Sequence, residues 1–238
     1  MTPFGALCRK ELLGMLRSPG TWMLLAGFQF LAAVFFLVVL GTTSSSDLAG
    51  VYFDLGMLAL ILAPMLTAAA FGPEWREGTM ELLLTSAVKP RHLVLAKYLG
   101  AVGVLALATV LSVQFPFWVA VVGQADPGAA VAGLGGSFLL GATVAAMGTF
   151  AAAATRSTPA AALLGFALAL GFYFVHSLGL VFGIDEGNLP DRFSFYLRFG
   201  LFTRGLVDTG DVAFFVLFAA AFLAMATAAL EAARSARD

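Results

Sequence analysis

The chain has 238 residues, of which 61% are hydrophobic and only 11% are charged, and its formal net charge is −1. A soluble domain has about 25% charged residues, so this composition excludes one and indicates an integral membrane protein. The net charge and the scattered basic residues argue against nucleic acid as a partner. A single cysteine, Cys8, excludes an internal disulfide and a paired-thiol metal or redox site.

The chain begins with an amphipathic segment, residues 4–17. Its apolar side chains recur at helical spacing and are Phe4, Cys8, Leu12, Met15 and Leu16. Basic side chains on the remaining surface are typical of a helix that lies in the membrane interface beside anionic headgroups. Ser18, Pro19 and Gly20 are expected to end this helix. The apolar run that follows is too long for a signal peptide, so we expect it to be retained as a span.

Six apolar runs are long enough to cross a bilayer, which takes about 20 residues per helix. They are residues 22–40, 51–71, 93–122, 129–154, 159–182 and 211–230. An even number of spans places both termini on the same side of the membrane. Most lysine and arginine residues fall on that side, so the positive-inside rule predicts that both termini are cytosolic.

A charged segment, residues 72–86, separates the second and third apolar runs. Pro73, followed closely by Glu74 and Glu77, predicts a short helix that begins at Pro73, because proline and carboxylates suit a helix N-terminus. At about 3.6 residues per turn, Glu74, Glu77 and Glu81 fall on one stripe of this helix. Two interpretations are open: a solvated connection that happens to be helical, or a helix that docks a cytosolic partner.

The long segment before the last span, residues 183–210, combines three arginines with an aromatic middle. Aromatic rings interspersed with arginines are typical of a headgroup boundary, which predicts one or two short helices that lie on the outer leaflet. A plain interface-seeking loop and a functional gate are both compatible with this pattern.

Three polar residues in or at the edge of the apolar runs are candidates for a translocation pathway: Gln29, Gln114 and His176. A polar group in hydrocarbon costs free energy unless it has a partner or faces water. Each of them is also explained by an interhelical hydrogen bond or by a place at the interface. Pro64 and Pro116 are expected to kink the second and third spans, because proline removes a helix hydrogen bond.

Small residues recur every four positions in the fourth apolar run, at Gly133, Ser137, Gly141, Ala145 and Thr149. Such a stripe lets another helix approach closely. The spacing leaves open whether that neighbour belongs to the same chain or to a second copy.

Several chemistries lack their sequence motifs. No Gly-Lys dipeptide occurs, so the chain has no P-loop, and its two histidines form no metal-binding motif. One enzymatic alternative remains, an intramembrane dyad of Ser137 and His176. The small-residue stripe already explains Ser137, and the serine lacks the Gly-x-Ser-Gly motif of rhomboid-type proteases.

Residues 74–101, EWREGTMELLLTSAVKPRHLVLAKYLGA, resemble the cytosolic segment between the second and third spans of type-2 ATP-binding-cassette permeases, in particular the gliding-motility (GldF-like) and NosY-like branch. Residues 9–24 are similar to the amphipathic elbow helix of that family. Residues 202–234 are similar to its last loop and sixth helix. The resemblance extends over essentially the whole chain.

The resemblance implies an all-α integral membrane fold: six transmembrane helices, an N-terminal elbow helix, a cytosolic coupling helix and short outer-leaflet helices before the last span. The chain, residues 1–238, would be one permease domain. It would comprise an elbow at 1–20, a coupling segment at 72–90 and an extracytoplasmic loop at 183–210.

The resemblance also implies a non-catalytic subunit, without a metal or cofactor of its own, whose partner ATPase binds ATP and magnesium. Two ATPase copies would dock on the coupling helix. The residues implied for that contact are Glu74, Trp75, Arg76, Glu77 and Glu81.

The implied location is the bacterial cytoplasmic (inner) membrane. Six spans are half of the usual complement, so the resemblance implies a second copy of this chain or a homologous permease, and it admits a periplasmic or membrane accessory protein. The implied function is substrate export driven by the separate ATPase. The alternative is a mechanotransmitting subunit, which passes ATPase-driven motion to periplasmic partners and transports nothing itself.

Overall fold

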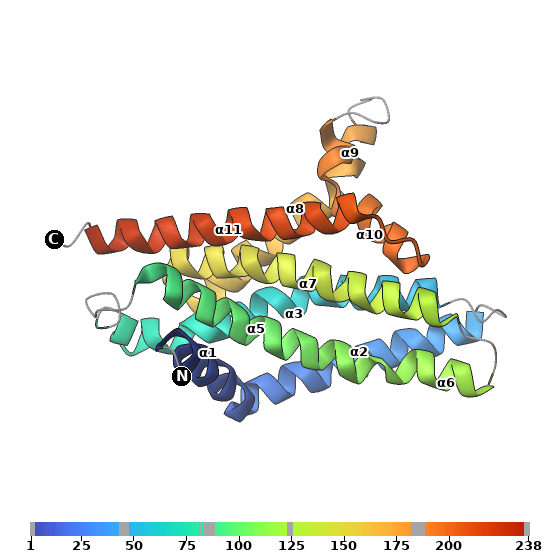
Figure 1. The fold of residues 1–238 in the computed structure, drawn as a ribbon, viewed down its shortest axis with the longest axis horizontal. Helices are drawn as coiled ribbons and strands as arrows, with labels where there is room; N and C mark the ends of the chain where they lie inside the picture. The colour runs from blue at the N-terminus through green and yellow to red at the C-terminus, as the bar shows by residue number, and fades with distance from the viewer. Residues whose placement is uncertain are drawn as a thin grey trace.

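The computed structural model describes residues 3–42, 48–80, 82, 89–122, 126–181 and 189–235, and in these ranges the chain is helical with no strand. In chain order the helices are α1 (Pro3–Arg17), α2 (Pro19–Thr42), α3 (Ala49–Arg76), α5 (Pro90–Ser112), α6 (Gln114–Val122), α7 (Pro127–Thr155), α8 (Thr158–Val181), α9 (Leu189–Phe193), α10 (Phe195–Thr203) and α11 (Thr209–Ser235). The long helices lie side by side in one elongated bundle (Figure 1).

Within the described residues, six helical stretches are long and apolar enough to cross a membrane. They coincide with the six predicted apolar runs, and the third is built from α5 and α6. The predicted multi-pass membrane architecture is therefore confirmed. Both ends of the chain lie toward the same end of the bundle, as an even number of spans requires (Figure 1).

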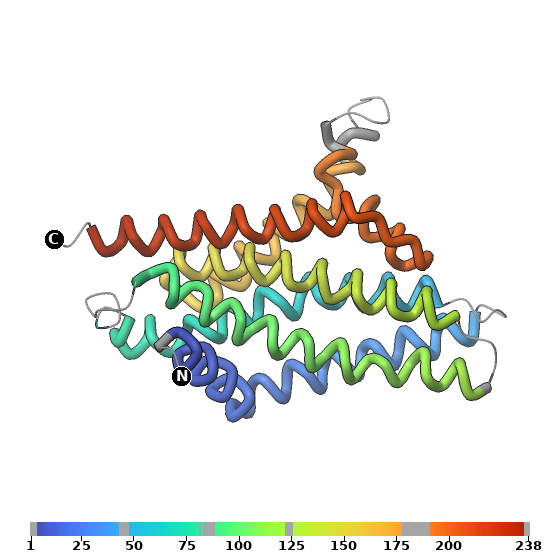
Figure 2. The backbone as a smooth tube through the Cα atoms, in the orientation of Figure 1, coloured from blue at the N-terminus to red at the C-terminus, as the bar shows by residue number. Residues whose placement is uncertain are grey.

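Helices α3 and α7 form the centre of the bundle. In their most apolar stretches, 78% and 72% of the residues are buried inside the protein, against 22% in α2, α8 and α11. Figure 2 shows α7 running between α11 and α5. The peripheral helices instead keep large apolar side chains exposed, such as Phe30 and Leu217, as lipid-facing surfaces require.

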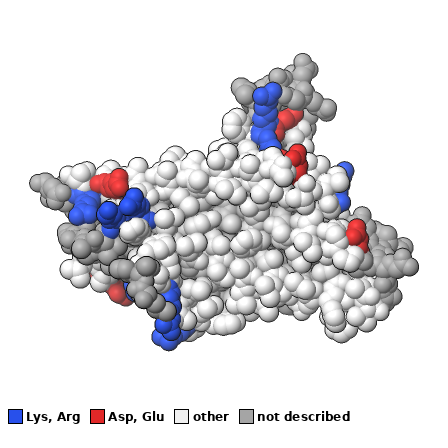
Figure 3. Space-filling model, in the orientation of Figure 1, with Lys and Arg blue, Asp and Glu red and all other residues white. Residues whose placement is uncertain are grey.

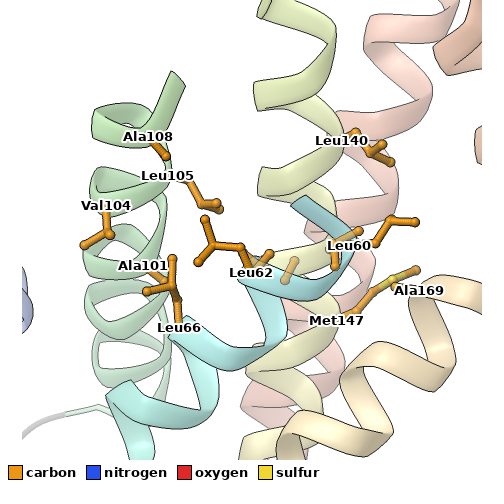
Figure 4. Packing of buried hydrophobic residues seen from close by; sticks show 14 of the residues in the cluster. Leu60, Leu62, Leu66, Ala101, Val104, Leu105, Ala108, Leu140, Met147 and Ala169 are labelled. Atoms are coloured by element: carbon orange, nitrogen blue, oxygen red, sulfur yellow. The ribbon is translucent and has the colours of Figure 1, made fainter. Parts of the chain in front are cut away.

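Side chains from four helices interlock around α3. Leu62 points toward Leu105 of α5, whereas Leu60 lies on the side of α7 and α8, near Met147 and Ala169 (Figure 4). All five of these side chains are buried. Because lipid is as apolar as leucine, close van der Waals packing rather than transfer from water holds such helices together.

The small-residue stripe on α7 faces α3, so its close neighbour belongs to the same chain and not to a second copy. A Cβ atom added to Gly141 would lie 3.3 Å from the Cβ atom of Ala59, and one added to Gly133 would overlap the ring of Tyr52. The absence of side chains at these glycines therefore sets the close approach of the two central helices.

The prolines act differently in the two spans that contain them. The third span breaks at Val113, between α5 and α6, as expected from Pro116, which has no N–H to donate to the Ser112 carbonyl. Pro64 lies inside α3, which continues as one helix. The Thr67 hydroxyl donates to the Pro64 carbonyl at 3.0 Å in the turn that follows.

Two short helices, α9 and α10, precede the last span, as predicted, but three of the four phenylalanine and tyrosine rings of α10 are not on the surface, and only Tyr196 is exposed. Phe195, Phe199 and Phe202 are buried in the bundle. Gly56 of α3 makes room for the ring of Phe199, since a Cβ atom there would overlap that ring. The prediction of surface-seeking rings is wrong for these three, whose burial anchors α10, while α9 projects from the bundle (Figure 1).

Candidate functional site

Charged side chains gather at the end of the bundle that carries both termini, whereas the middle of the visible face carries no charged side chains (Figure 3). We call this the terminal end and define it by residues 3–17, 70–80, 89–97 and 155–158. A second group of charges lies on and beside the projecting α9 (Figure 3). We call residues 189–212 the far segment.

The helix predicted to begin at Pro73 does not begin there. Pro73 lies in the last turn of α3, which ends at Arg76, and the Glu77 N–H donates to the Pro73 carbonyl at 2.9 Å. Gly78 then adopts a φ of 70°, which stops the helix, and residues 79, 80 and 82 are helical again. The prediction fails because α3 is buried as far as Gly72, so packing carries the helix past the proline.

Lys97 of α5 is the most unusual side chain of the terminal end, because none of it is exposed. Its ammonium donates to the Ala70 carbonyl at 2.6 Å, to Glu74 Oε2 at 2.5 Å and to Glu11 Oε2 at 3.3 Å. These three acceptors use the three N–H groups of a lysine. The Lys97 ammonium also lies 5.1 Å from the centre of the Phe71 ring.

The position of this cation follows from the direction of α3. Ala70 and Glu74 lie near its C-terminal end, where unpaired carbonyls carry partial negative charge and a carboxylate is unfavourable. A buried lysine at this point compensates for both. Lys97, Glu74 and Glu11 thus form an ion cluster from three helices, α5, α3 and α1.

A pocket of about 250 Å³ lies beside the ion cluster, between α1, α3 and the start of α2. Its walls include Lys10, Glu11, Thr21, Pro73 and Glu74. The Lys10 ammonium lies 3.3 Å from Glu11 Oε1, so both oxygens of that carboxylate have a cationic partner. With Lys10 counted beside the cluster, charge is balanced, with two ammonium groups and two carboxylates.

The structure separates the residues predicted to dock an ATPase. Arg76 and Glu77 are exposed at the end of α3. Glu74 turns inward to Lys97, and only 15% of its side chain is exposed. Trp75 is half-buried, and Glu81 lies outside the described residues.

Trp75 joins the end of α3 to the turn between α7 and α8. The Arg156 guanidinium lies 5.7 Å from the Trp75 ring, within range of a cation–π contact. Arg156 has a φ of 54°, a left-handed conformation in which α7 ends. The Trp75 indole N–H is buried and finds no hydrogen-bond partner in the described part of the chain.

The three predicted pathway residues do not converge. The Gln29 amide donates to the Ala108 carbonyl at 2.9 Å and to the Ser112 hydroxyl at 3.4 Å, which ties α2 to α5. Gln114 is exposed at the start of α6. His176, near the end of α8, pairs with Asp191 of α9. Gln29 and His176 therefore make separate contacts between elements.

Ser137 and His176 have separate partners. The Ser137 hydroxyl lies 2.8 Å from the Gly133 carbonyl and 3.1 Å from the Tyr52 carbonyl, which ties α7 to α3. His176 Nδ1 lies 2.6 Å from Asp191 Oδ1. These contacts give each side chain a role in joining helices, as the small-residue stripe suggests for Ser137.

Grooves in the apolar part of the bundle are lined almost entirely by hydrophobic side chains. One of about 180 Å³ lies between α2 and α3, bordered by Phe28, Ile61 and Met65. Another of about 450 Å³ lies between α7, α10 and α11, bordered by Phe202 and Val207. Neither is lined by Gln29, Gln114 or His176.

Sequence reasoning missed the roles of Glu11 and Lys97. Lys97 interrupts the third apolar run, and a charge within a span is a signal of function or of a buried partner. By the positive-inside rule, Lys97 counts only as one of the positive charges that orient the chain. Glu11 had a weaker signal, a lone carboxylate within a basic amphipathic helix.

The comparisons with known proteins add no family to this description. No protein-family model matches the chain, and no curated protein matches its sequence. The functional interpretation therefore rests on the sequence resemblance and on the geometry of the terminal end.

Proposed function

We propose that this chain is the membrane permease subunit of an ATP-binding-cassette system whose ATPase is a separate chain. The observation that carries the proposal is the end of α3, where Arg76 and Glu77 stand exposed beside a buried ion cluster. That end lies within residues 74–101, the segment that resembles the cytosolic loop of type-2 permeases. The six apolar helices and the similar segments 9–24 and 202–234 support the same family.

The docking surface in this proposal differs from the one implied by the resemblance alone. Arg76 and Glu77 are exposed and available to a partner, whereas the Trp75 N–H is buried, so only the exposed part of the Trp75 ring is available for a contact. Glu74 is already engaged by Lys97, so we assign it a structural part. Glu81, outside the described residues, stays a predicted contact.

In this proposal the terminal end faces the cytosol of a bacterium, and the six spans lie in its inner membrane. The basic residues at that end fit the positive-inside rule. Two ATPase copies would bind ATP and magnesium, and a second copy of this chain or a homologous permease would complete twelve spans. ATP-driven closure would shift α3 and α5 and move substrate outward.

Mechanotransmission without transport is the second candidate, and the projecting α9 favours it. This helix leaves the bundle beside α10, and its Arg192 and Phe193 are exposed (Figure 1). The His176–Asp191 pair links α9 to α8. A projection tied to a span is suited to pass motion to a periplasmic or membrane accessory protein.

The docking proposal is tested by exchanging the charges at the end of α3, with Arg76→Glu and Glu77→Lys together. The net charge is unchanged, and both side chains are exposed, so folding and insertion should persist. We expect the ATPase to be lost from gentle-detergent preparations, as measured by mass spectrometry of the purified complex.

The matched control exchanges another exposed acid–base pair at the same end of the bundle, Glu231→Lys with Arg234→Glu on α11. This variant should keep the ATPase. If the α3 variant retains the ATPase at the level of the unmodified chain, Arg76 and Glu77 do not form the docking contact. If the unmodified chain never carries an ATPase, the permease proposal itself fails.

A further inference from the structure

We propose that Lys97 is a positioning residue that couples α1 to the last turn of α3, so that these two elements move together when the end of α3 is displaced. The three acceptors of the Lys97 ammonium come from two helices. Glu11 belongs to α1, whereas Ala70 and Glu74 belong to α3. One ammonium on a third helix, α5, thus holds elements that lie far apart in the sequence.

Apart from this link, α1 packs mainly against α5. A Cβ atom added to Gly103 would lie 2.6 Å from Leu12 Cδ1, and one added to Gly100 would lie 3.4 Å from Glu11 Cβ. Toward α3, by contrast, the pocket of about 250 Å³ opens beside the cluster. The shared ammonium bridges this loosely packed side, so it links α1 to α3 where apolar packing is interrupted.

The last turn of α3 is held less firmly than an ordinary helical turn. Pro73 has no N–H to donate to the Ala69 carbonyl, so the helix lacks one hydrogen bond there, and Gly78 ends the turn in a left-handed conformation. Ala69, Pro73 and Glu74 all border the pocket, which provides space for displacement. The bond from Lys97 to the Ala70 carbonyl holds this weakened turn.

A cluster that only stabilised the fold could be neutralised without any effect on how α1 moves relative to α3. Charged side chains in a protein interior can often be replaced by neutral ones of similar volume without loss of stability, provided that all members are replaced together. A neutral triple variant, Glu11→Gln with Glu74→Gln and Lys97→Met, therefore removes the ionic link and leaves no buried charge. This variant should keep its stability and lose the coupling between α1 and the end of α3.

The first test uses the full chain in lipid nanodiscs without an ATPase. Spin labels are attached to Ala6→Cys on α1 and Thr79→Cys after α3, both exposed positions, in a Cys8→Ser background. With Lys97 in place we expect one narrow distance peak between the labels. The triple variant should remain folded by size-exclusion chromatography but lose that peak to a broad distribution.

The matched control neutralises the ion pair of the far segment, Arg198→Met with Asp211→Asn, and should keep the narrow peak. If the triple variant also keeps it, α1 and the end of α3 are held together without Lys97 and the inference is overturned. Should the triple variant fail to fold, the double variant Glu11→Leu with Lys10→Gln removes only the link to α1, because leucine has no acceptor for the Lys97 ammonium, and it is judged by the same peak.

The second test rests on the proposed function, because it needs the ATPase. A third label, at exposed Ala160→Cys on α8, serves as the reference. Upon ATP addition to the assembled complex, the distances from Ala160 to Thr79 and to Ala6 should change together. In the triple variant only the distance to Thr79 should change.

The two proposals fail in different ways. An unmodified chain that binds no ATPase contradicts the permease function, while the nanodisc measurement still judges the Lys97 link. An ATPase-bound triple variant in which both distances still change contradicts the Lys97 link and leaves the permease function standing.

Discussion

The terminal end and the far segment each contain a cation that pairs with a buried carboxylate, but they use it differently. Lys97 is wholly buried and bonded to groups of residues 11, 70 and 74. Arg198 is 27% exposed, pairs with Asp211 and donates to the Arg192 carbonyl at 3.1 and 3.0 Å. Its guanidinium also lies 4.2 Å from the Phe214 ring.

The sequence separation of the partners shows what each cation does. Lys97 joins three helices that are distant in the sequence, so it holds tertiary structure. Arg198 joins α9, α10 and α11, which follow one another, so it braces a local turn of the chain. Loss of Lys97 should therefore affect the whole bundle, and loss of Arg198 mainly its own segment.

The helix dipoles increase this difference. Glu74 lies in the last turn of α3, where the helix end is partially negative, whereas Asp211 lies in the first turn of α11, where the helix end is partially positive. Without its cation, Glu74 stays in an unfavourable place and Asp211 in a favourable one. The same deletion is thus expected to cost more at the terminal end.

Lys97→Met should give the largest effect. It leaves Glu11 and Glu74 without their shared cation, and breaking such a buried cluster costs about 3 kcal/mol or more. The measurement is the free energy of unfolding in mixed detergent micelles titrated with SDS. A loss no greater than that of Arg198→Met would contradict the contrast between the two ends.

Adding Glu11→Gln and Glu74→Gln to Lys97→Met is the control for this prediction. The triple variant should regain most of the lost stability, because no unpaired carboxylate remains. If it stays as unstable as Lys97→Met alone, lost packing of the lysine stem rather than unpaired charge explains the effect.

Two glycines on α7 test whether packing shows the same contrast, because one contacts the central helix α3 and the other contacts the short helix α10. A Cβ atom at Gly148 would lie 3.0 Å from the Pro64 Cα atom and overlap the Thr67 hydroxyl, so Gly148→Ala must separate two central helices. We expect a loss of about 2 kcal/mol by the SDS titration, typical of overpacking. In Gly136→Ala the added Cβ atom would overlap Phe202 Cβ on α10, and the loss should be smaller, because that short helix can shift.

Gly135→Ala is the matched control, because no atom beyond its chain neighbours and its own helix backbone lies within 4 Å of the added Cβ position. It should leave stability unchanged or raise it slightly, since alanine favours a helix by up to about 1 kcal/mol over glycine. Equal losses at Gly148 and Gly136 would mean that the α10 contact is as rigid as the α3–α7 contact.

Much of the fold was predictable because apolar runs, prolines and small residues that lie close together in the sequence determine it. The six spans, the break after Arg17 and the break near Pro116 follow from apolar length and from proline chemistry. The stripe that contains Gly141 predicted a close helix neighbour, and the structure identifies it as α3. These features depend on local sequence.

The candidate site was predicted less well, because it depends on which helices meet. Glu74 belongs by position to an exposed charged segment, but α5 places Lys97 beside it and turns it inward. Phe195 and Phe199 have the composition of an interfacial segment, yet α3 provides a gap at Gly56 that buries Phe199. A single sequence carries no signal for such pairings between distant segments.

Arg198→Met should have the smallest effect on global stability, about 1 kcal/mol, because the side chain is partly exposed and Asp211 remains at the positive end of α11. Its stem can still cover Phe214, since methionine keeps the apolar contact. The loss should instead appear locally, as faster amide hydrogen exchange in α9 and α10 with little change in α1 and α5. Arg204→Met, which replaces an exposed arginine of the same segment, should change neither measurement. If Arg198→Met accelerated exchange in α1 or α5 as well, the far segment would hold the whole bundle as Lys97 does, and the contrast between a tertiary link and a local brace would fail.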